Sequence, residues 1–265
     1  MKNRPPVMIL CGGMGTRLRE ETEVRPKPMV EIGDRPILWH IMQRYAHYGL
    51  TDFILCLGYK GHVIKDYFVN YKARTTDLRV RLGQPEKLQY LNSHPEEDWT
   101  VTLAETGLEA QTGARVASAG RYVEEPTFCL TYGDGIGDID IDALLAFHTK
   151  HGKIGTVTGV RPPGRFGEIQ RTPEGAVGEF NEKPQVAEGI INGGFFVFQK
   201  EFIDRYLAPL KDPILEREPL QNLARDGELM VYVHEGFWQP MDTFREMKLL
   251  NDMWATGHAP WKPRA

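Results

Sequence analysis

Continuous apolar runs alternate along this chain with segments whose apolar residues recur at helical spacing. Val7–Leu10 and residues 53–58 (FILCLG) are short apolar runs, the pattern of strands buried on both faces of a sheet. Between them, residues 36–48 predict a helix that begins near a proline and ends before Gly49. Residues 63–71 repeat the amphipathic helical spacing. This order of elements predicts a doubly wound, mostly parallel sheet.

The same alternation continues through the second half of the chain. The apolar strand within 128–135 (FCLTYGDG) ends at glycines that flank an acid, and a helix is predicted from Ile141 to His148. The other predicted elements are strands at 155–160, 192–198 and 229–234, a hairpin at 166–184 around residues 173–175, and helices at 200–207, 219–227 and 243–256. Residues 72–111 mix short alternating runs with polar insertions, and no element is assigned to them. We expect one α/β domain over residues 1–265, with three Rossmann-like layers around a mixed, mostly parallel sheet.

Charge and composition narrow the classes of protein. The formal net charge is −4 and no long run of Lys and Arg is present, which argues against a general nucleic-acid binder. No apolar stretch approaches the roughly 18 residues of a membrane span, and the apolar run near the start is too short for a signal-peptide core. Cys11, Cys56 and Cys129 are widely separated and are expected to be small buried side chains. We expect a cytoplasmic protein that binds no membrane.

The glycines after the first predicted strand form a candidate phosphate site. The loop contains Gly12, Gly13, Gly15, Thr16 and Arg17. A P-loop needs lysine after its last glycine, and the dinucleotide fingerprint needs a third glycine where Leu18 stands, so both templates fail. Glycines directly after a strand let backbone N–H groups approach an anion, and Arg17 adds a charged contact to phosphate oxygens. On these residues alone, a phosphate site and a tight turn without ligand both stay open.

Three charged residues elsewhere in the chain extend this candidate site. Lys27 is flanked by two prolines, which restrict the backbone and fix where the lysine leaves the chain. Asp134 and Asp242 each follow a predicted strand, and open α/β sheets bind ligands at the carboxyl ends of their strands. Two aspartates beside bound phosphates suit Mg²⁺, which takes one or two carboxylates together with substrate phosphates. Taken singly, each residue also fits an exposed turn with no ligand.

Together these segments resemble the sugar-1-phosphate nucleotidyltransferases. The resemblance is carried by GGMGTRL at 12–18, PKPM at 26–29, TYGDG at 131–135, EKP at 182–184, INGGFF at 191–196 and FWQPMDT at 237–243. The first two motifs in combination are highly specific, and the set covers nearly the whole chain. The resemblance implies the nucleotide-diphospho-sugar transferase fold, Mg²⁺ as cofactor, and attack of a sugar phosphate on the α-phosphorus of a nucleoside triphosphate with release of pyrophosphate.

Some segments resemble one branch of that family, which makes CDP-glucose from CTP and glucose 1-phosphate. They include EIGDRPILWHIM, GYKGHVIKDYF, PPGRFG and the TG…TGAR loop at 106–115. Within that loop, LEAQ at 108–111 is more apolar than the branch pattern, so uridylyl or thymidylyl transfer to the same sugar is the alternative. The resemblance further implies a homo-oligomer, and a product used for dideoxy sugars of surface polysaccharides such as lipopolysaccharide O-antigen.

The resemblance also implies three groups of site residues. The catalytic group is Arg17, Lys27, Asp134 and Asp242, with both aspartates as metal ligands. The nucleotide-binding group is Leu10, Gly12, Gly13, Gly15, Thr16, Thr106, Gly113, Arg115 and Gly133. The sugar-phosphate group is Glu182, Lys183, Asn192 and Gly193. For Tyr132 and Trp238, a ligand contact and plain packing both stay open.

Two other classes of protein fit the sequence less well. A nucleotide-binding regulator without catalytic activity is expected to have lost Lys27 or one of the aspartates, and all of them are present. A dinucleotide oxidoreductase conflicts with the failed glycine fingerprint. Nicotinamide absorbance and pyrophosphate release distinguish an oxidoreductase from a transferase.

Overall fold

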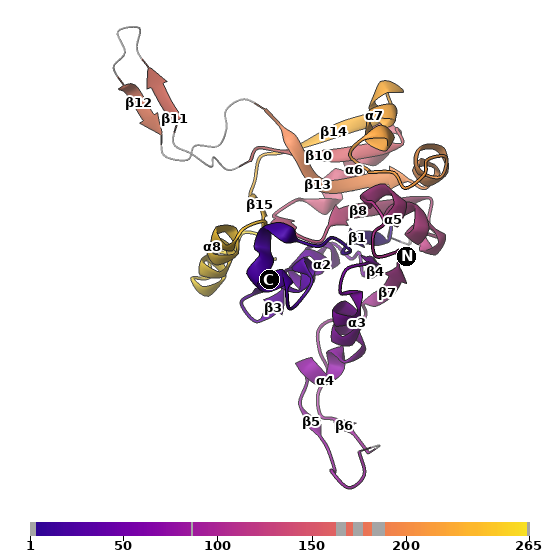
Figure 1. The fold of residues 1–265 in the computed structure, drawn as a ribbon, viewed down its shortest axis with the longest axis vertical. Helices are drawn as coiled ribbons and strands as arrows, with labels where there is room; N and C mark the ends of the chain where they lie inside the picture. Colours follow the sequence, from indigo (N-terminus) through magenta and orange to yellow (C-terminus); the bar gives the residue numbers. More distant parts are fainter. Residues whose placement is uncertain (1–3, 86, 163–167, 172–176, 182–188, 264–265) are drawn as a thin grey trace.

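A seven-stranded sheet forms the centre of the molecule. The computed structural model describes residues 4–85, 87–162, 168–171, 177–181 and 189–263. In spatial order the strands are β14 (Leu229–His234), β10 (Gly155–Val160), β13 (Ile191–Gln199), β8 (Thr127–Tyr132), β1 (Val7–Leu10), β4 (Asp52–Leu57) and β7 (Thr100–Glu105). Neighbouring strands are parallel except that β13 runs antiparallel to both β8 and β10. The expected mixed, mostly parallel sheet is therefore confirmed (Figure 1).

Apolar cores lie on both faces of this sheet. Side chains of β1 alternate between them, because successive strand residues point to opposite faces: Val7 and Ile9 join one core, Met8 and Leu10 the other. The first core packs against α2 (Ile37–His47), α3 (Gly61–Val69), α6 (Ile141–His151) and α8 (Phe244–Ala255). The second packs against α5 (Thr112–Ala119), a π-helical turn (Ile203–Leu207) and α7 (Glu218–Arg225). Helices on both faces give the three expected layers.

The carboxyl ends of the central parallel strands meet at one edge of the sheet. Leu10 at the end of β1 is opposite Cys56 of β4 on one side and Tyr132 of β8 on the other. Short elements lie beyond this edge: β2 (Glu31–Ile32) pairs with β3 (Arg35–Pro36), and β9 (Gly135–Gly137) pairs with β15 (Trp238–Pro240). The remaining short helices are α1 (Arg19–Thr22), α4 (Tyr71–Thr75) and 3₁₀ turns at Thr16–Leu18, Lys27–Met29 and Gly120–Tyr122.

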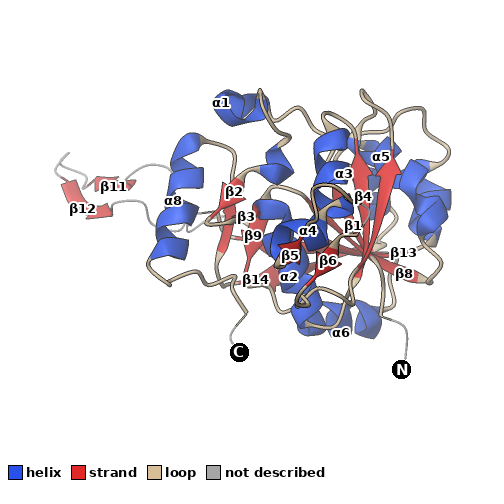
Figure 2. Cartoon of the chain, turned by 90° about the horizontal axis from the view of Figure 1, so that it is seen from below, coloured by secondary structure: helices blue, strands red, loops and turns tan. Residues whose placement is uncertain are grey.

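Two hairpins project from the body of the molecule. One consists of β11 (Glu168–Arg171) and β12 (Val177–Asn181), and it lies apart from the sheet in both views (Figures 1 and 2). The predicted hairpin at 166–184 is thus present, while its turn at 173–175 falls outside the described residues. The other consists of β5 (Leu78–Arg79) and β6 (Gln89–Tyr90). It carries exposed apolar side chains at Leu78, Val80, Leu82, Leu88 and Tyr90.

The structure corrects the sequence prediction in two places and supplies elements in a third that had none. The helix predicted over 63–71 is divided, because α3 ends at Val69 and α4 begins at Tyr71. The helix predicted at 200–207 is π-helical from Ile203. Residues 72–111, to which no element was assigned, contain the hairpin β5–β6 and the edge strand β7. None of the helices in the described ranges combines the length and the apolar character that crossing a bilayer requires.

Candidate active site

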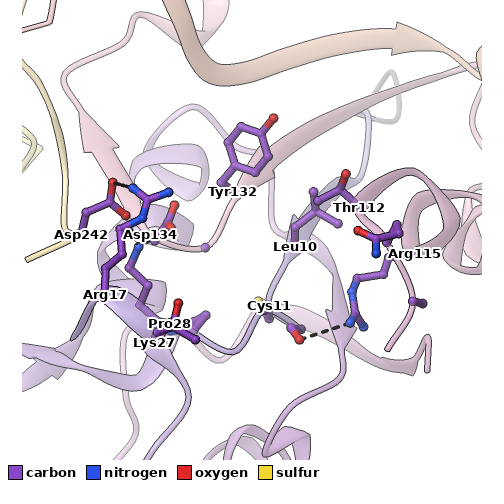
Figure 3. A pocket seen from close by; sticks show the side chains of 17 residues that line it. Leu10, Cys11, Arg17, Lys27, Pro28, Thr112, Arg115, Tyr132, Asp134 and Asp242 are labelled. Atoms are coloured by element: carbon purple, nitrogen blue, oxygen red, sulfur yellow. Dashed lines mark hydrogen bonds and ion pairs between the residues drawn. The ribbon is translucent and has the colours of Figure 1, made fainter. Parts of the chain in front are cut away.

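A cavity of about 360 Å³ opens at the carboxyl ends of β1 and β8 (Figure 3). Small-molecule sites commonly have volumes of roughly 300–1,000 Å³. Its lining residues are Leu10, Cys11, Gly12, Gly13, Gly15, Thr16, Arg17, Lys27, Pro28, Ala110, Gln111, Thr112, Arg115, Tyr132, Gly133, Asp134 and Asp242. The glycine loop, the proline-flanked lysine and both aspartates therefore surround one cavity, although they are far apart in sequence.

The glycine loop connects the end of β1 to the 3₁₀ turn at Thr16–Leu18. Gly15 has a left-handed φ of 62°, and a Cβ there would lie 2.8 Å from the Thr22 methyl carbon, so this turn requires glycine. The Thr22 hydroxyl also donates to the Gly15 carbonyl at 3.2 Å. A Cβ on Gly13 would meet no atom of the described chain within 4 Å. The backbone at Gly13 is therefore open to close approach by an anion from the cavity.

Lys27 lies between the two aspartates at one end of the cavity. Its Nζ donates to Asp134 Oδ2 and to Asp242 Oδ1, each at 2.6 Å. Backbone pairing brings the acids together, because β9 pairs with β15 and Met241 N donates to Asp134 O at 2.8 Å. Two strand ends that are distant in the chain thus present their carboxylates to one ammonium group.

Arg17 adds a second cation to this end of the cavity. It donates from Nη1 to Asp242 Oδ2 at 2.7 Å, although 71% of its side chain is exposed. Asp242 is positioned by the start of α8, where the backbone N–H groups of Asp242 and Thr243 both donate to Glu246 Oε2 in a capping box. The charged cluster, Arg17, Lys27, Asp134 and Asp242, therefore balances two cations against two anions.

The electrostatic setting keeps Lys27 charged. Burial lowers the pKa of the ammonium, but Asp134 and Asp242 raise it by more, so the pKa of Lys27 lies above its ordinary value. The residue is only 8% exposed. A buried ammonium between two carboxylates is therefore a fixed positive charge at neutral pH.

The two aspartates fit a magnesium site of a particular kind. Carboxylate oxygens are the ligands that Mg²⁺ prefers, and it completes its shell with waters and substrate phosphates. In the described part of the chain, no group of three or more His, Cys, Asp or Glu side chains converges as a metal site. The donor set therefore matches a metal held by two carboxylates together with a phosphate ligand.

Arg115 lies at the opposite end of the cavity, on α5, and is 5% exposed. Its guanidinium donates, over 2.7–3.2 Å, to the backbone oxygens of Gly12, Leu57, Gly107 and Leu108 and to the hydroxyl of Thr106. Burial lowers the pKa of Arg115, and no salt bridge in the described residues includes it. Arg115, which lies beside the glycine loop in Figure 3, thus ties that loop to the end of β4 and to the segment 106–108.

The other predicted nucleotide-binding residues fall into two sets. Those that line the cavity are Leu10, Gly12, Gly13, Gly15, Thr16 and Gly133. Thr106 and Gly113 do not line the cavity and contact neighbouring parts of the chain. The Thr106 hydroxyl donates to Leu57 O at 2.6 Å, and a Cβ on Gly113 would lie 2.8 Å from Pro213 O, so glycine lets α5 pack against residues 213–215.

The predicted sugar-phosphate residues are only partly described. Glu182 and Lys183 lie outside the described residues. Asn192 and Gly193 lie at the start of β13, and the Asn192 amide donates to the Tyr132 hydroxyl at 3.3 Å. Gly193 O accepts a hydrogen bond from Trp238 Nε1 at 2.8 Å, so Trp238 joins the Asp242 segment to this strand. Tyr132 itself lines the cavity.

Sequence reasoning did not assign several lining residues to the site. They are Cys11, Pro28, Ala110, Gln111 and Thr112. Cys11 and Pro28 belong to or adjoin the two specific motifs, and residues 110–112 lie inside the 106–115 loop, so motif membership was the available signal. Asp212 and Glu216 contact the start of α5 and belong to no motif.

Known proteins resemble this chain both in sequence and in fold. A glucose-1-phosphate cytidylyltransferase from Salmonella typhi is 48% identical over 96% of this chain and 98% of its own length. A probable glucose-1-phosphate cytidylyltransferase from Bacillus subtilis is 44% identical over 96% of this chain and 98% of its own length. The crystal structure of HddC from Yersinia pseudotuberculosis shares the fold, with a TM-score of 0.68 and 22% identity over 95% of this chain and all of that one. The family model described as nucleotidyl transferase matches residues 6–245. The chain therefore belongs to the nucleotidyl transferase family.

Proposed function

We propose that this nucleotidyltransferase makes CDP-glucose and pyrophosphate from CTP and glucose 1-phosphate. The observation that carries the proposal is the charged cluster, Arg17, Lys27, Asp134 and Asp242, which shares a cavity with the glycine loop. The relative from Salmonella typhi, named for this reaction, supports the choice of base and sugar.

In the proposed reaction, an oxygen of the sugar phosphate attacks the α-phosphorus of CTP. A new P–O bond forms to the sugar phosphate, the bond from the α-phosphorus to the bridging oxygen breaks, and its electron pair leaves with pyrophosphate. Both reactants are anions, so the protein must neutralise charge and align them in line rather than supply a nucleophile. We assign the glycine loop to the nucleotide phosphates, Arg17 to the departing pyrophosphate, and Lys27 to both substrates.

Asp134 and Asp242 are proposed to hold Mg²⁺ when substrates are bound. The metal would neutralise triphosphate charge and polarise phosphoryl oxygens. Lys27 and Arg17 occupy these carboxylates in the present structure, and their release frees both cations for phosphate oxygens. In this proposal the same four side chains pair either with one another or with metal and phosphate.

The two ends of the cavity are assigned to different parts of the substrates. We place the nucleoside beside residues 106–115, where Thr112 and Gln111 line the wall, and the sugar phosphate on the side of Tyr132, whose hydroxyl Asn192 contacts. From the family resemblance we also propose Gly193, Glu182 and Lys183 as sugar-phosphate residues. In this assignment Thr106, Gly113 and Arg115 shape the base-binding wall through the packing described above.

We also propose a homo-oligomer, which the exposed apolar side chains of the β5–β6 hairpin support.

A nucleotide panel tests the proposed function. CTP, UTP, dTTP, ATP and GTP are each supplied with glucose 1-phosphate and Mg²⁺, and pyrophosphate release is measured. CTP is expected to give the highest kcat/KM, with CDP-glucose identified by mass spectrometry. An equal or higher value with UTP or dTTP would overturn the choice of base in favour of uridylyl or thymidylyl transfer, while leaving the family assignment intact.

A further inference from the structure

Glu216 joins two walls of the cavity and belongs to none of the sequence motifs. Its Oε1 accepts from the Tyr132 hydroxyl at 2.5 Å, and its Oε2 accepts from the Thr112 hydroxyl at 2.8 Å. Both partners line the cavity, Tyr132 at the end of β8 and Thr112 at the start of α5 (Figure 3). One carboxylate therefore connects a nucleotide-side residue to the tyrosine that precedes Gly133 and Asp134.

Residues 212–216 hold this carboxylate in place by bonding to the start of α5. The pairs are Gln111 N with Asp212 Oδ1 at 2.9 Å, Ala114 N with Pro213 O at 3.1 Å, and Leu215 N with Thr112 Oγ1 at 2.9 Å. The first N–H groups of a helix have no acceptor within it, so this segment supplies acceptors that the helix lacks. Glu216 thus extends from a backbone segment that is itself fixed against α5.

Tyr132 is held on its other sides by β13, which carries Asn192 and Gly194. Gly194 has a φ of 78°, and a Cβ there would lie 2.4 Å from a ring carbon of Tyr132, so the ring packs directly on the glycine backbone. The Asn192 amide donates to the same hydroxyl that Glu216 accepts from. The ring is therefore packed on Gly194, and its hydroxyl contacts both Asn192 and Glu216.

We propose that Glu216 is a positioning residue for the transfer reaction. Its carboxylate fixes Tyr132 between the nucleotide and sugar-phosphate sides of the cavity and couples that ring to Thr112. This inference rests on the proposed function, because it assigns the two sides to two substrates. A hydrogen bond to an ionised acceptor is stronger than one between neutral groups, so the carboxylate orders both hydroxyls at once.

Steady-state kinetics of single variants test the role of the carboxylate. Glu216→Ala is expected to raise the KM values for CTP and for glucose 1-phosphate by about tenfold each, with kcat changed by less than about threefold, since an ordering hydrogen bond is lost at both sides. Tyr132→Phe should raise mainly the KM for glucose 1-phosphate, and Thr112→Val mainly the KM for CTP. Glu216→Gln, which still accepts from Tyr132, should recover most of the loss.

A double-mutant cycle separates positioning from general support of the fold. If Glu216 acts through Tyr132, Glu216→Ala with Tyr132→Phe should raise the KM for glucose 1-phosphate no further than Glu216→Ala alone. Glu218→Ala removes an exposed acid two residues along and should leave both KM values unchanged. Unchanged KM values in Glu216→Ala, or additive effects in the cycle, would overturn the proposal.

Failure of the proposal for Glu216 can be told apart from failure of the proposed choice of base. If wild-type enzyme prefers another nucleotide, the same constants are measured with that nucleotide, and only the choice of base has failed. Thermal unfolding of every variant is recorded as well. If Glu216→Ala does not fold, Tyr132→Phe and Thr112→Val carry the test, and unchanged KM values for both substrates in both variants would overturn the proposal.

Discussion

The two ends of the cavity hold their positive charges in different ways. At one end, Lys27 and Arg17 are paired with carboxylates, and the arginine is largely exposed. At the other end, Arg115 is buried and donates to carbonyl and hydroxyl oxygens of three separate segments. One end is an assembly of ion pairs at an open cavity, and the other is a cation built into the core.

This difference determines which of the charges can take part in the reaction. Carboxylates that face a cavity can exchange an ammonium for a metal or a phosphate-bound cation, because water and substrate satisfy the groups that are released. Releasing Arg115 would break the hydrogen bonds that join the glycine loop to Leu57 and to the segment 106–108, which costs free energy. None of the salt bridges among the described residues includes Arg115, and Asp212 acts on it only as a neighbouring charge, so Arg115 still adds a positive field beneath the glycine loop. We therefore expect activity to depend on Lys27 and stability to depend on Arg115.

The largest expected effect comes from removing the exchangeable charge. Lys27→Met should reduce kcat by about 10³-fold, because a charge aimed at the transition state is lost from a largely buried site. The free energy of unfolding should change by about 1 kcal/mol or less, since Asp134 borders a cavity open to water and Asp242 keeps its ion pair with Arg17. Pyrophosphate release and urea denaturation measure the two quantities.

Lys65→Met is the matched control for this prediction. Lys65 pairs with Glu105 at 2.6 Å on the surface, with both side chains more than a third exposed, and it does not line the cavity. It should leave kcat and stability nearly unchanged. A Lys27→Met enzyme with normal turnover would remove the lysine from the proposed mechanism.

Next in size is the effect of removing the fixed charge. Arg115→Met fills a similar volume but removes the hydrogen bonds that join the glycine loop, the end of β4 and the segment 106–108, so the free energy of unfolding should fall by roughly 2–4 kcal/mol. Its kcat, measured at a temperature where the variant is folded, should fall far less than that of Lys27→Met. Chemical denaturation monitored by circular dichroism gives the stability.

Two further results decide what Arg115 does. Arg121→Met, at an exposed arginine that follows α5, serves as control and should not lower stability measurably. If Arg115→Met instead keeps wild-type stability and raises the KM for CTP alone, the residue contacts the base directly and the cavity has two chemically active ends.

Much of the fold is predictable because its central strands are continuous apolar runs. The run at 155–160 is observed as β10 with the same bounds, and Val7–Leu10 as β1. The edge strand β7 was not predicted, because one side of an edge strand faces solvent and its Thr and Glu residues alternate with apolar ones. The break between α3 and α4 at Asn70 interrupts a pattern whose apolar spacing continues, so periodicity alone does not reveal it.

The site residues fall into two groups, those that a local sequence motif predicts and those whose contacts depend on the tertiary fold. Glycines beside a strand, a lysine between prolines and acids after strands have local signatures, and the structure brings those residues together around the cavity. The bonds of Arg115 depend on Leu57, Gly12 and the segment 106–108, which only the tertiary fold brings near it. Glu216 belongs to no sequence motif, and its partners Thr112 and Tyr132 are distant in the chain. Residues whose role is to position others therefore escape prediction from one sequence.

The smallest expected effect tests whether Arg115 is fixed. A Cβ on Gly12 would lie 2.3 Å from Nη1 of Arg115, whereas one on Gly13 would meet no described atom within 4 Å. If hydrogen bonds hold the guanidinium, Gly12→Ala should lower the free energy of unfolding by about 1–3 kcal/mol through overpacking, and Gly13→Ala should change it little.

The same substitution placed in an Arg115→Met background completes the comparison. Without the guanidinium the clash is gone, so Gly12→Ala should then cost clearly less than in the wild-type protein, and the two substitutions should be non-additive. Urea denaturation of the four proteins in this cycle measures the coupling free energy. Equal costs in both backgrounds would mean that the end of Arg115 moves aside freely. The contrast between a fixed and an exchangeable end of the cavity would then fail at the fixed end, because an arginine that yields to a methyl group is not held by its backbone acceptors.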